Sequence, residues 1–367
     1  MAQYLRTIIS QFAIPGDVTD IRSNELGHIN DTFVVTVQET SGLRRYIVQR
    51  INRRVFRQPA ALMENIVRIT EFLRTKIAAE GGDPRRETLT LIPTRAGKNF
   101  YVTPEGDYWR VYRFIEGARA YQQVESPEHL YQAARAFGRF MRRLEDFPAQ
   151  ALHITIPDFH HTPKRFASFV QAVDADAQNR ARDARDLIEF ALARGDNTGR
   201  IVDALASGDL PLRVTHNDTK FDNVLIDDAT GEGVCVLDLD TVMPGSALYD
   251  FGDFVRTGAN TAAEDEPDPG RVRLSLAYFD AIARGFLQET AATLTPQEKA
   301  WLPLGAWTII FEQGLRFLGD YLNGDVYYRI HRPAQNLDRA RTQFKLVADL
   351  EANEDALARI IDRYSVR

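Results

Sequence analysis

The sequence predicts an α+β protein of two lobes: a small N-terminal lobe built on an antiparallel sheet, residues 1–116, and a larger, mostly helical C-terminal lobe, residues 117–367. Three observations predict this fold class. Residues 31–51 alternate apolar and polar positions on either side of a Ser-Gly turn, which is typical of a β-hairpin. Beyond residue 117, long segments repeat apolar residues at a helical spacing. A length of 367 residues is ample for two such lobes.

The small lobe is predicted to contain two helices and a set of strands. Residues 4–13 carry apolar side chains at a helical spacing, and residues 31–38 and 44–51 form the two arms of the hairpin. A long helix is expected between Pro59 and Gly81, because proline is favoured in the first turn of a helix and glycine just beyond its end. Further strands are expected at 88–92, 99–103 and 108–114.

The large lobe is predicted to begin after a boundary near residues 116–120. Its clear strands lie only around residues 212–240. The segment Thr257–Gly270 is rich in Ala, Asp, Glu and Pro, which predicts a mobile loop. Helices are expected at 127–145, 162–194, 270–290, 297–323 and 335–363.

The composition excludes several classes of protein. A net charge of −6 and a pI of about 5.7 provide no general basic field, so neither nucleic acid nor a membrane surface is an expected partner. No apolar run reaches the length of about 18 residues that a membrane span needs. The single cysteine, Cys235, cannot form an internal disulfide, and the N-terminal residues lack the pattern of a secretory signal. A cytoplasmic location is therefore expected.

Residues 216–223 read H-N-D-T-K-F-D-N, and residues 238–240 read D-L-D. Asp218, Asn223 and Asp238 have the order and spacing that kinase-type phosphoryl transfer requires. That chemistry needs an Asp that accepts the proton of a substrate hydroxyl, then an Asn and a second Asp that hold magnesium. The alternative is a polar surface loop before an ordinary hairpin, and the joint match in order, spacing and strand context disfavours it.

Other residues of this region are expected to support the chemistry. Lys220 is placed to neutralise charge on the transferred phosphoryl group, although a surface lysine would look the same in the sequence. Asp250 and Asp253 are expected to brace the loop by accepting hydrogen bonds, which is a structural role.

The small lobe offers candidates for nucleotide binding. Gly27, His28 and Asn30 lie between two predicted strands, where a turn could present backbone N–H groups to phosphates. A plain hairpin turn is an equal alternative, and His28 and Asn30 are also placed to face the acceptor. Phe114 and Glu116 end the last strand, where the chain would pass the adenine, although a bare hinge explains them almost as well.

The third strand lacks the lysine that usually holds the α- and β-phosphates. Arg50 is the predicted substitute. Val48 lies two residues earlier on the same strand face and is predicted to pack on the base. Glu64, on the following helix, is a candidate partner for Arg50 or simply a solvated acid.

A polar helix face lies near the C-terminal end of the chain. Glu312, Arg316 and Asp320 recur every four residues and share one face of a predicted helix, with Tyr321 beside them. Such a face suits a sugar with several hydroxyls. It equally suits an exposed helix with i,i+4 ion pairs.

These motifs resemble a known family. The stretch His216–Arg256 is similar to the catalytic core of the aminoglycoside phosphotransferase and choline kinase superfamily, which is related to protein kinases. The motifs span residues 27 to 341, nearly the whole chain. Several of them resemble the N-acetylhexosamine 1-kinase branch: 216–220, 238–245, 249–253, 27–30, 46–52 and 316–322.

The resemblance implies a two-lobed protein-kinase-like fold that uses ATP and Mg²⁺. It implies transfer of phosphate to the anomeric hydroxyl of a free N-acetylhexosamine. It implies Asp218 as the base, Asn223 and Asp238 as magnesium ligands, and Lys220 near the γ-phosphate.

The resemblance also favours Arg316 and Tyr321 as acceptor-binding residues. Two other functions stay open. One is a kinase for another small alcohol, such as homoserine, a methylthio-sugar, an amino alcohol or an aminoglycoside. The other is a non-catalytic nucleotide-binding module, which is supported only by the missing third-strand lysine.

Overall fold

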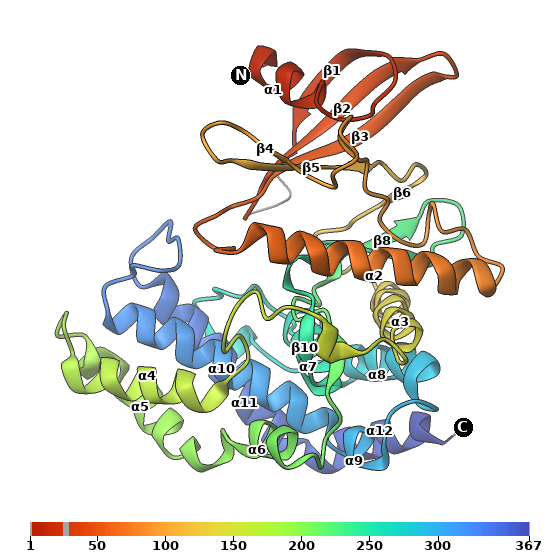
Figure 1. Ribbon diagram of the computed structural model, residues 1–367. Coiled ribbons are helices and arrows are strands. Elements are labelled where there is room, and N and C mark those ends of the chain that lie inside the picture. The colour runs from red at the N-terminus through yellow and green to blue at the C-terminus, as the bar shows by residue number, and fades with distance from the viewer. Residues whose placement is uncertain (1, 25–28, 367) are drawn as a thin grey trace.

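The computed structural model describes residues 2–24 and 29–366 and confirms the two-lobed α+β fold, with an antiparallel sheet above a helical lobe (Figure 1). The small lobe holds a five-stranded sheet in the order β1-β2-β3-β5-β4, with every neighbouring pair antiparallel. Its strands are β1 (Asp17–Ser23), β2 (Asp31–Glu39), β3 (Gly42–Arg50), β4 (Tyr101–Val102) and β5 (Tyr108–Arg113).

The hairpin of β2 and β3 and the strand β5 agree with the sequence prediction. The sequence does not predict β1, because this edge strand is polar and partly exposed on both faces. Residues 88–92 contribute one bridge, from Leu91 to Tyr112, instead of a full strand. Pro93 has no N–H with which to extend that pairing.

One face of the sheet packs on the helix α1 (Ala2–Ile9). This core is small and closed, and it contains Leu5, Ile8, Phe12, Val35, Val37, Val48, Trp109 and Val111. The opposite face of the sheet looks down onto the helix α2 and the large lobe (Figure 1).

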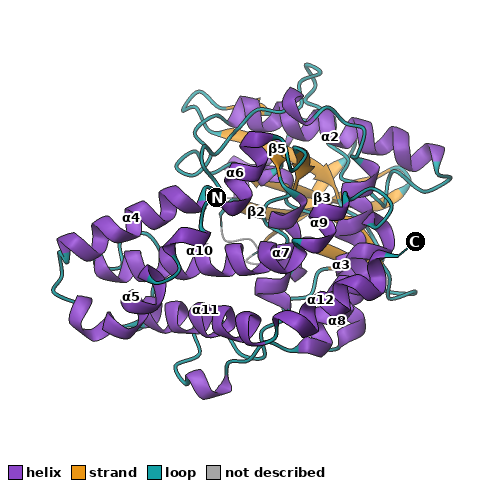
Figure 2. Cartoon of the chain, turned by 90° about the horizontal axis from the view of Figure 1, so that it is seen from below, coloured by secondary structure: helices purple, strands orange, loops and turns teal. Residues whose placement is uncertain are grey.

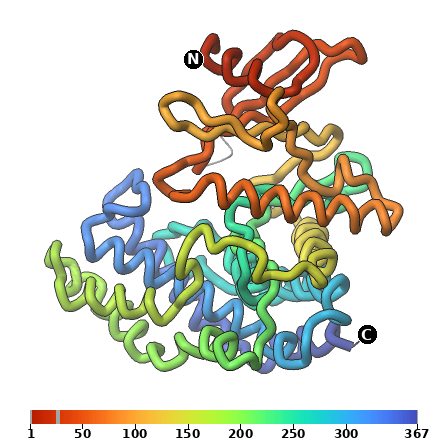
Figure 3. Tube along the Cα trace, viewed as in Figure 1, coloured from red at the N-terminus to blue at the C-terminus, as the bar shows by residue number. Residues whose placement is uncertain are grey.

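The helix α2 (Pro59–Ala79) starts as the proline predicts and stops just before Gly81, but it packs with the large lobe. Asn65 Nδ2 donates to the carbonyl oxygens of His153 and Val242 at 2.8 and 3.2 Å. In the tube view α2 runs along the top of the large lobe, beneath the sheet (Figure 3). Its apolar face belongs to the large-lobe core: Leu62, Met63, Ile66, Ile69, Leu73 and Ile77.

The helices of the large lobe form two groups in the view from below (Figure 2). In one group α4 (Thr162–Ala175), α5 (Arg185–Leu192), α10 (Leu302–Leu322) and α11 (Gln335–Ala352) lie together, and in the other α3 (Pro127–Arg143), α8 (Leu276–Thr290) and α12 (Glu354–Ser365) do. The remaining helices are α6 (Arg200–Ser207), α7 (Ala247–Gly258) and α9 (Pro296–Ala300). Among the described residues, no helix is both long and apolar enough to cross a membrane.

The predicted helix at 162–194 is two helices in the structure. α4 ends at Asp176, whose φ of 34° lies in the left-handed region, and a short 3₁₀ turn leads into α5. Asp is one of the residues that can adopt the left-handed conformation in place of glycine. The end of α4 is therefore not marked by a glycine in the sequence. The predicted helix at 335–363 also divides, at Asn353.

Two small sheets frame the H-N-D-T-K-F-D-N segment. β7 (Arg213–Thr215) pairs with β10 (Met243–Gly245), and β8 (Val224–Asp227) lies between β6 (Ala118–Arg119) and β9 (Gly233–Val236). The segment therefore leaves one sheet and enters the other, and the D-L-D follows β9 directly.

Candidate active site

The loop after β7 is held from behind by the buried ring of His216. Its edge contacts Phe137 and Phe140, at centroid distances of 5.4 and 6.0 Å. Nδ1 accepts the backbone N–H of Asp218 at 3.3 Å, so Nε2 carries the proton and donates to the Leu237 carbonyl at 2.7 Å. This imidazole joins the loop to the end of β9 and fixes the backbone at Asp218.

Asp250, in the first turn of α7, supports the same loop. Its two carboxylate oxygens accept the backbone N–H groups of His216 and Asn217, each at 2.8 Å. Burial raises the pKa of Asp250 to about 6, even though His216 and these N–H groups favour its charged form. Asp253, one turn later, forms an ion pair with Arg256 at 2.9 Å.

The side chains of Asp218, Asn223 and Lys220 converge. Asn223 Nδ2 donates to the Asp218 carboxylate at 3.0 Å and to the Asp218 carbonyl oxygen at 2.8 Å. Lys220 Nζ lies 3.4 Å from the same carboxylate. Burial opposes the charge on Lys220, but three nearby carboxylates raise its pKa above the usual value: Asp218, Asp222 and Asp238.

Asp238 lies at the start of the D-L-D in a left-handed conformation, with φ of 52°. Burial, together with the carboxylates of Asp240 and Asp218, raises its pKa to about 7. Because the amide nitrogen of Asn223 is engaged by Asp218, the amide oxygen is the atom left to face a cation. A carboxylate and an amide oxygen beside an excess of negative charge suit a hard divalent cation. No cluster of three or more His, Cys, Asp or Glu ligands occurs in the described part of the chain.

Asp240, the second acid of the D-L-D, ties the two lobes together. Its carboxylate accepts two bonds from Arg110 on β5, Nη1–Oδ1 at 2.5 Å and Nη2–Oδ2 at 2.9 Å, and one from Asn30 Nδ2 at 2.7 Å. The side chains of Arg110 and Asp240 are 1% and 2% exposed. Arg110 Nε also donates to Gln49 Oε1 on β3 at 3.0 Å.

A pocket of about 440 Å³ lies between the lobes beside these residues, although Asp218 itself is not one of the residues that line it. The large lobe contributes Lys220, Asp222, Asn223 and Asp238 to its walls. The small lobe contributes residues of the sheet and of the connector: Asn30, Ile47, Gln49, Arg110, Phe114 and Ile115. The pocket therefore has apolar residues beside arginines at the connector, where Arg45, Arg113 and Arg119 also line it, and carboxylates and Lys220 at the other end.

The side chains of β3 point to the sides of the sheet opposite to those predicted. Ile47 and Gln49 line the pocket, whereas Val48 is fully buried in the core beneath α1. Arg50 shares that face and forms ion pairs with Asp31 and Asp107, so the structure does not bring it to the pocket. Successive strand residues face opposite sides, and both sides of this strand carry apolar residues, which left the pattern ambiguous.

Only some of the other predicted nucleotide-binding residues that the structure describes line the pocket. Gly27 and His28 lie outside the described residues, whereas Asn30 and Phe114 line the pocket. Glu116 forms an ion pair with Arg45, whose guanidinium lies 3.9 Å from the Phe114 ring centroid. Glu64 hydrogen-bonds with His153 at 2.6 Å and has no contact with Arg50 among the described residues.

The polar residues of α10 have different surroundings and do not form one binding site. Glu312 is buried and bonds to His160 at 3.1 Å and Thr162 at 2.7 Å. Arg316 lines a separate pocket between α4 and α10. The guanidinium carbon of Arg180 lies 4.8 Å from the centroid of the Tyr321 ring, and Tyr321 does not line that pocket. The structure therefore does not bring Arg316 and Tyr321 together.

Asp320, the third acid of this face, anchors the loop that follows α10. Its carboxylate accepts the backbone N–H groups of Val326, Tyr327 and Tyr328 at 3.0, 2.8 and 2.9 Å. The amide of Asn336 donates to it at 2.9 Å.

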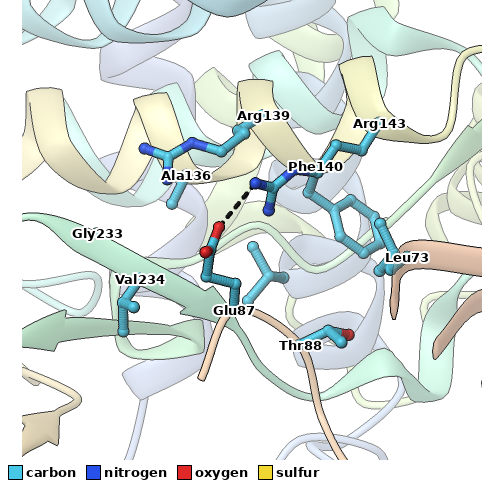
Figure 4. Close-up of a pocket in the computed structure, with 10 residues that line it drawn as sticks. Leu73, Glu87, Thr88, Ala136, Arg139, Phe140, Arg143, Gly233 and Val234 are labelled. Carbon is cyan, nitrogen blue, oxygen red and sulfur yellow. Dashed lines mark hydrogen bonds and ion pairs between the residues drawn. The ribbon is translucent and has the colours of Figure 1, made fainter. Parts of the chain in front are cut away.

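A further cavity lies behind β9, between α3 and the end of α2 (Figure 4). Its volume is about 20 Å³, and the Arg143–Glu87 ion pair of 2.7 Å crosses its wall. A space of this size holds about one water molecule. The cavity lies where residues of the two lobes meet, and it is too small to hold a substrate.

Sequence reasoning missed Arg110, Asp240 and Gln49 as neighbours in the site. The D-L-D motif includes Asp240, but its partner lies 130 positions away on β5. An arginine flanked by Trp109 and Val111 in the middle of a strand is the signal that could have found it, because a buried charge requires a partner.

Comparison with known proteins agrees with this geometry. The model of the phosphotransferase enzyme family (APH) matches residues 20–288, more than half of the chain. A microcompartment-associated aminopropanol kinase superposes with a TM-score of 0.62 at 16% identity, covering 98% of this chain and 99% of that chain. The choline kinase from Cryptosporidium parvum gives a TM-score of 0.60 at 14% identity, covering 100% and 99%.

An amicoumacin kinase in complex with AMP-PNP, Ca²⁺ and Ami gives a TM-score of 0.59 at 14% identity, covering 94% of this chain and 92% of that chain. At such identities the likeness shows the kinase-like fold alone, and the family model supplies the assignment. The chain belongs to the phosphotransferase enzyme family and is a small-molecule phosphotransferase that acts on hydroxyl acceptors.

Proposed function

We propose that this enzyme transfers the γ-phosphate of ATP, with Mg²⁺, to the anomeric hydroxyl of an N-acetylhexosamine. The observation that carries the proposal is the convergence of Asp218 with Asn223 and Lys220, both of which line the interlobe pocket together with Asp238. The sugar assignment rests on the resemblance of the sequence motifs to the N-acetylhexosamine 1-kinase branch.

Asp218 is proposed to orient the acceptor hydroxyl and to take its proton as the new oxygen–phosphorus bond forms. The transition state of phosphoryl transfer is loose, so most of the rate comes from positioning and charge stabilisation. The hydrogen bond from Asn223 and the braced loop hold the Asp218 carboxylate in one direction. Lys220 is proposed to stabilise the transferred phosphoryl group, and its raised pKa keeps it positively charged.

Asn223 and Asp238 are the residues that would hold Mg²⁺. When bound, the ion neutralises charge on the nucleotide phosphates. The adenine is proposed to lie at the connector end of the pocket, against Ile47 and beside Phe114.

The alternative of a non-catalytic module depends on the missing third-strand lysine, and β3 indeed presents Gln49 to the pocket. Arg110 on the adjacent strand also lines the pocket, but its guanidinium is paired with the Asp240 carboxylate. The argument against this alternative is therefore the presence of Asp218, Asn223 and Asp238.

The acceptor is proposed to approach Asp218 from the side of the large lobe. Burial opposes the charge on Arg256, but Asp253 and Glu264 raise its pKa above the usual value, with a smaller contribution from Asp218, and Arg256 forms an ion pair with Glu264 at 2.8 Å. Arg316 and Tyr321 are proposed as acceptor-binding residues on the sequence resemblance, and His28 is proposed on its position between two predicted strands.

The test is a screen of free sugars and small alcohols for acceptor-dependent release of ADP, with magnesium present and again with chelator. N-acetylglucosamine or N-acetylgalactosamine should stimulate release, and the product should lose its reducing end. A response to homoserine or an amino alcohol but to neither sugar would remove the sugar assignment and leave the kinase assignment in place. The Asp218→Asn variant is the control for acceptor-independent hydrolysis.

A further inference from the structure

The peptide bond between Asn217 and Asp218 is held on both sides by histidine rings. The N–H of Asp218 donates to Nδ1 of His216 at 3.3 Å. On the other side, the carbonyl oxygen of Asn217 lies 3.4 Å from Nε2 of His160. Asn217 has φ of 65°, a left-handed conformation that few residues other than glycine adopt. The two rings therefore help to fix the orientation of this peptide, and with it the position of Asp218.

His160 lies just before α4, and α4 packs along α10 (Figure 2). The Nδ1 atom of His160 lies 3.1 Å from Oε1 of Glu312 on α10. The other carboxylate oxygen of Glu312 accepts the hydroxyl of Thr162 at 2.7 Å. The side chains of His160 and Glu312 are 10% and 3% exposed. The imidazole is therefore a largely buried link between α10 and the loop after β7.

Both partners of this ring are hydrogen-bond acceptors. Burial alone would raise the pKa of Glu312, but the hydrogen bond and charge of His160, the hydroxyl of Thr162 and the charge of Arg316 lower it, so Glu312 is a carboxylate. The carbonyl oxygen of Asn217 also only accepts. A neutral imidazole has a single N–H and can donate to one of the two. The two contacts together therefore require the imidazolium, which donates from both nitrogens.

Charged and titratable groups reach the surroundings of this ring from three helices. Glu312 contacts a ring nitrogen directly. The ring of Tyr249 lies 5.0 Å from the imidazole, centroid to centroid, and burial together with the Glu312 charge raises its pKa, so its hydroxyl stays neutral. The others are Asp250 on α7, Arg316 on α10, and Arg165 on α4, which donates to the carbonyl oxygen of Phe159. Glu312 is therefore the partner whose replacement tests the pair.

We infer that His160 is a positioning residue that acts only as an imidazolium, by holding the Asn217 carbonyl oxygen and so directing the Asp218 carboxylate. When the ring loses a proton, the remaining N–H stays with Glu312, the shorter and charge-assisted contact. The Nε2 lone pair then faces the Asn217 oxygen, and the hydrogen bond to the loop is lost. Turnover should therefore fall as rising pH removes this proton. The inference rests on the proposed role of Asp218 as the base.

The protonation state is tested first, without any reaction. Imidazole ¹⁵N spectra of the full chain distinguish an imidazolium from either neutral tautomer, and the spectrum of His160→Phe identifies the His160 signals among those of seven histidines. We expect an imidazolium at neutral pH in the wild type. Glu312→Gln keeps an acceptor for Nδ1 but removes the negative charge, so His160 should lose its proton at a lower pH in that variant. A neutral His160 at neutral pH would overturn the inference, whatever the kinase activity turns out to be.

The second test measures kcat against pH with ATP, magnesium and the acceptor that gives the largest response in the screen described above. His160→Phe should lower kcat about tenfold or more at neutral pH, because small displacements of a reacting group are costly, and leave the KM for ATP unchanged. The ratio of the wild-type kcat to that of His160→Phe should approach one as the pH rises. The ratio is used because Asp218, Asp238 and Lys220 titrate in both proteins.

His153→Phe is the matched control. It breaks another histidine–glutamate contact, with Glu64 at 2.6 Å, in a pair whose side chains are 42% and 56% exposed. This variant should keep the kcat and the pH profile of the wild type. An equal loss of kcat in His153→Phe would contradict a specific role of His160.

Glu312→Gln separates positioning from a merely structural role, since a Gln of the same shape keeps the bonds to both neighbours. Its kcat should fall at a lower pH than that of the wild type, by the same shift as its His160 ¹⁵N signals. A structural role would lower the unfolding midpoint and leave the pH profile where it was. A pH-independent kcat ratio, or a profile that stays in place while the His160 signals move, would overturn the inference. Near-normal turnover in Asp218→Asn would instead refute the proposed base and leave the ¹⁵N result standing.

Discussion

Replacing Arg110 with Gln tests the buried bond between the lobes. The change removes a guanidinium that is 1% exposed. Among the described residues, the carboxylate of Asp240, 2% exposed, then keeps only the amide of Asn30 as a side-chain donor. Removing one partner of a buried ion pair costs about 3–5 kcal/mol, because the other charge stays buried and uncompensated. Asp238, two residues away, makes the uncompensated charge larger.

The measurement is urea unfolding of wild-type and Arg110→Gln proteins, followed by far-UV circular dichroism. We expect the free energy of unfolding to fall by about 3–5 kcal/mol with little change in the m-value. The matched control is Arg185→Gln, which breaks an ion pair with Glu189 whose side chains are 81% and 63% exposed. That change should cost less than about 0.5 kcal/mol.

A double variant separates the ion pair from simple loss of packing. Arg110→Gln with Asp240→Asn replaces both charges, so its cost should be smaller than the sum of the two single costs by about 1–3 kcal/mol. Additive costs, or a loss of under about 1 kcal/mol in Arg110→Gln, would refute the idea that this ion pair stabilises the joined lobes.

Three further predictions concern the active site. Asp218→Asn should lower turnover by about 10²–10⁴-fold with an unchanged unfolding midpoint, and near-normal turnover would exclude Asp218 as the base. Arg50→Gln should leave the KM for ATP unchanged because Arg50 lies outside the pocket, and a large rise in KM would contradict this placement. For Asp250, the folded pKa of about 6 exceeds the unfolded value of about 3.9, so its contribution to stability falls as pH rises from about 4 to 6 and is constant above that window. The unfolding free energy of the wild type minus that of Asp250→Asn should therefore decrease by on the order of 3 kcal/mol across the window, and a flat difference would contradict the raised pKa.

The convergence of the candidate active-site residues could be predicted from sequence because these residues are close together in the chain. Asp218 and Asn223 are five positions apart, and their spacing alone places them in one loop. Asp238 follows an apolar strand that pairs with the strand after the loop, so a hairpin brings it close. Residues joined by one short loop and one hairpin can be arranged in few ways relative to one another.

Long-range features could not be predicted in the same way. β3 has apolar residues on both faces, so alternation could not decide between Val48 and Ile47 as the pocket residue. The pairing of Arg110 with Asp240 depends on how the two lobes pack, which no local pattern records. The separation of Arg316 from Tyr321 follows from helix geometry, since five residues turn a side chain well away from the first.

The packing of α2 has a consequence for how this enzyme can be handled. A chain cut after residue 116 would expose the apolar face of α2, which includes Leu62, Ile66 and Ile69, together with the side chain of Arg110. The C-terminal fragment would lose the α2 side chains that cover its core, and Asp240 would lose Arg110 as its partner. We therefore expect that neither half is stable when expressed alone, and that the whole chain is the smallest unit for production, truncation or domain exchange.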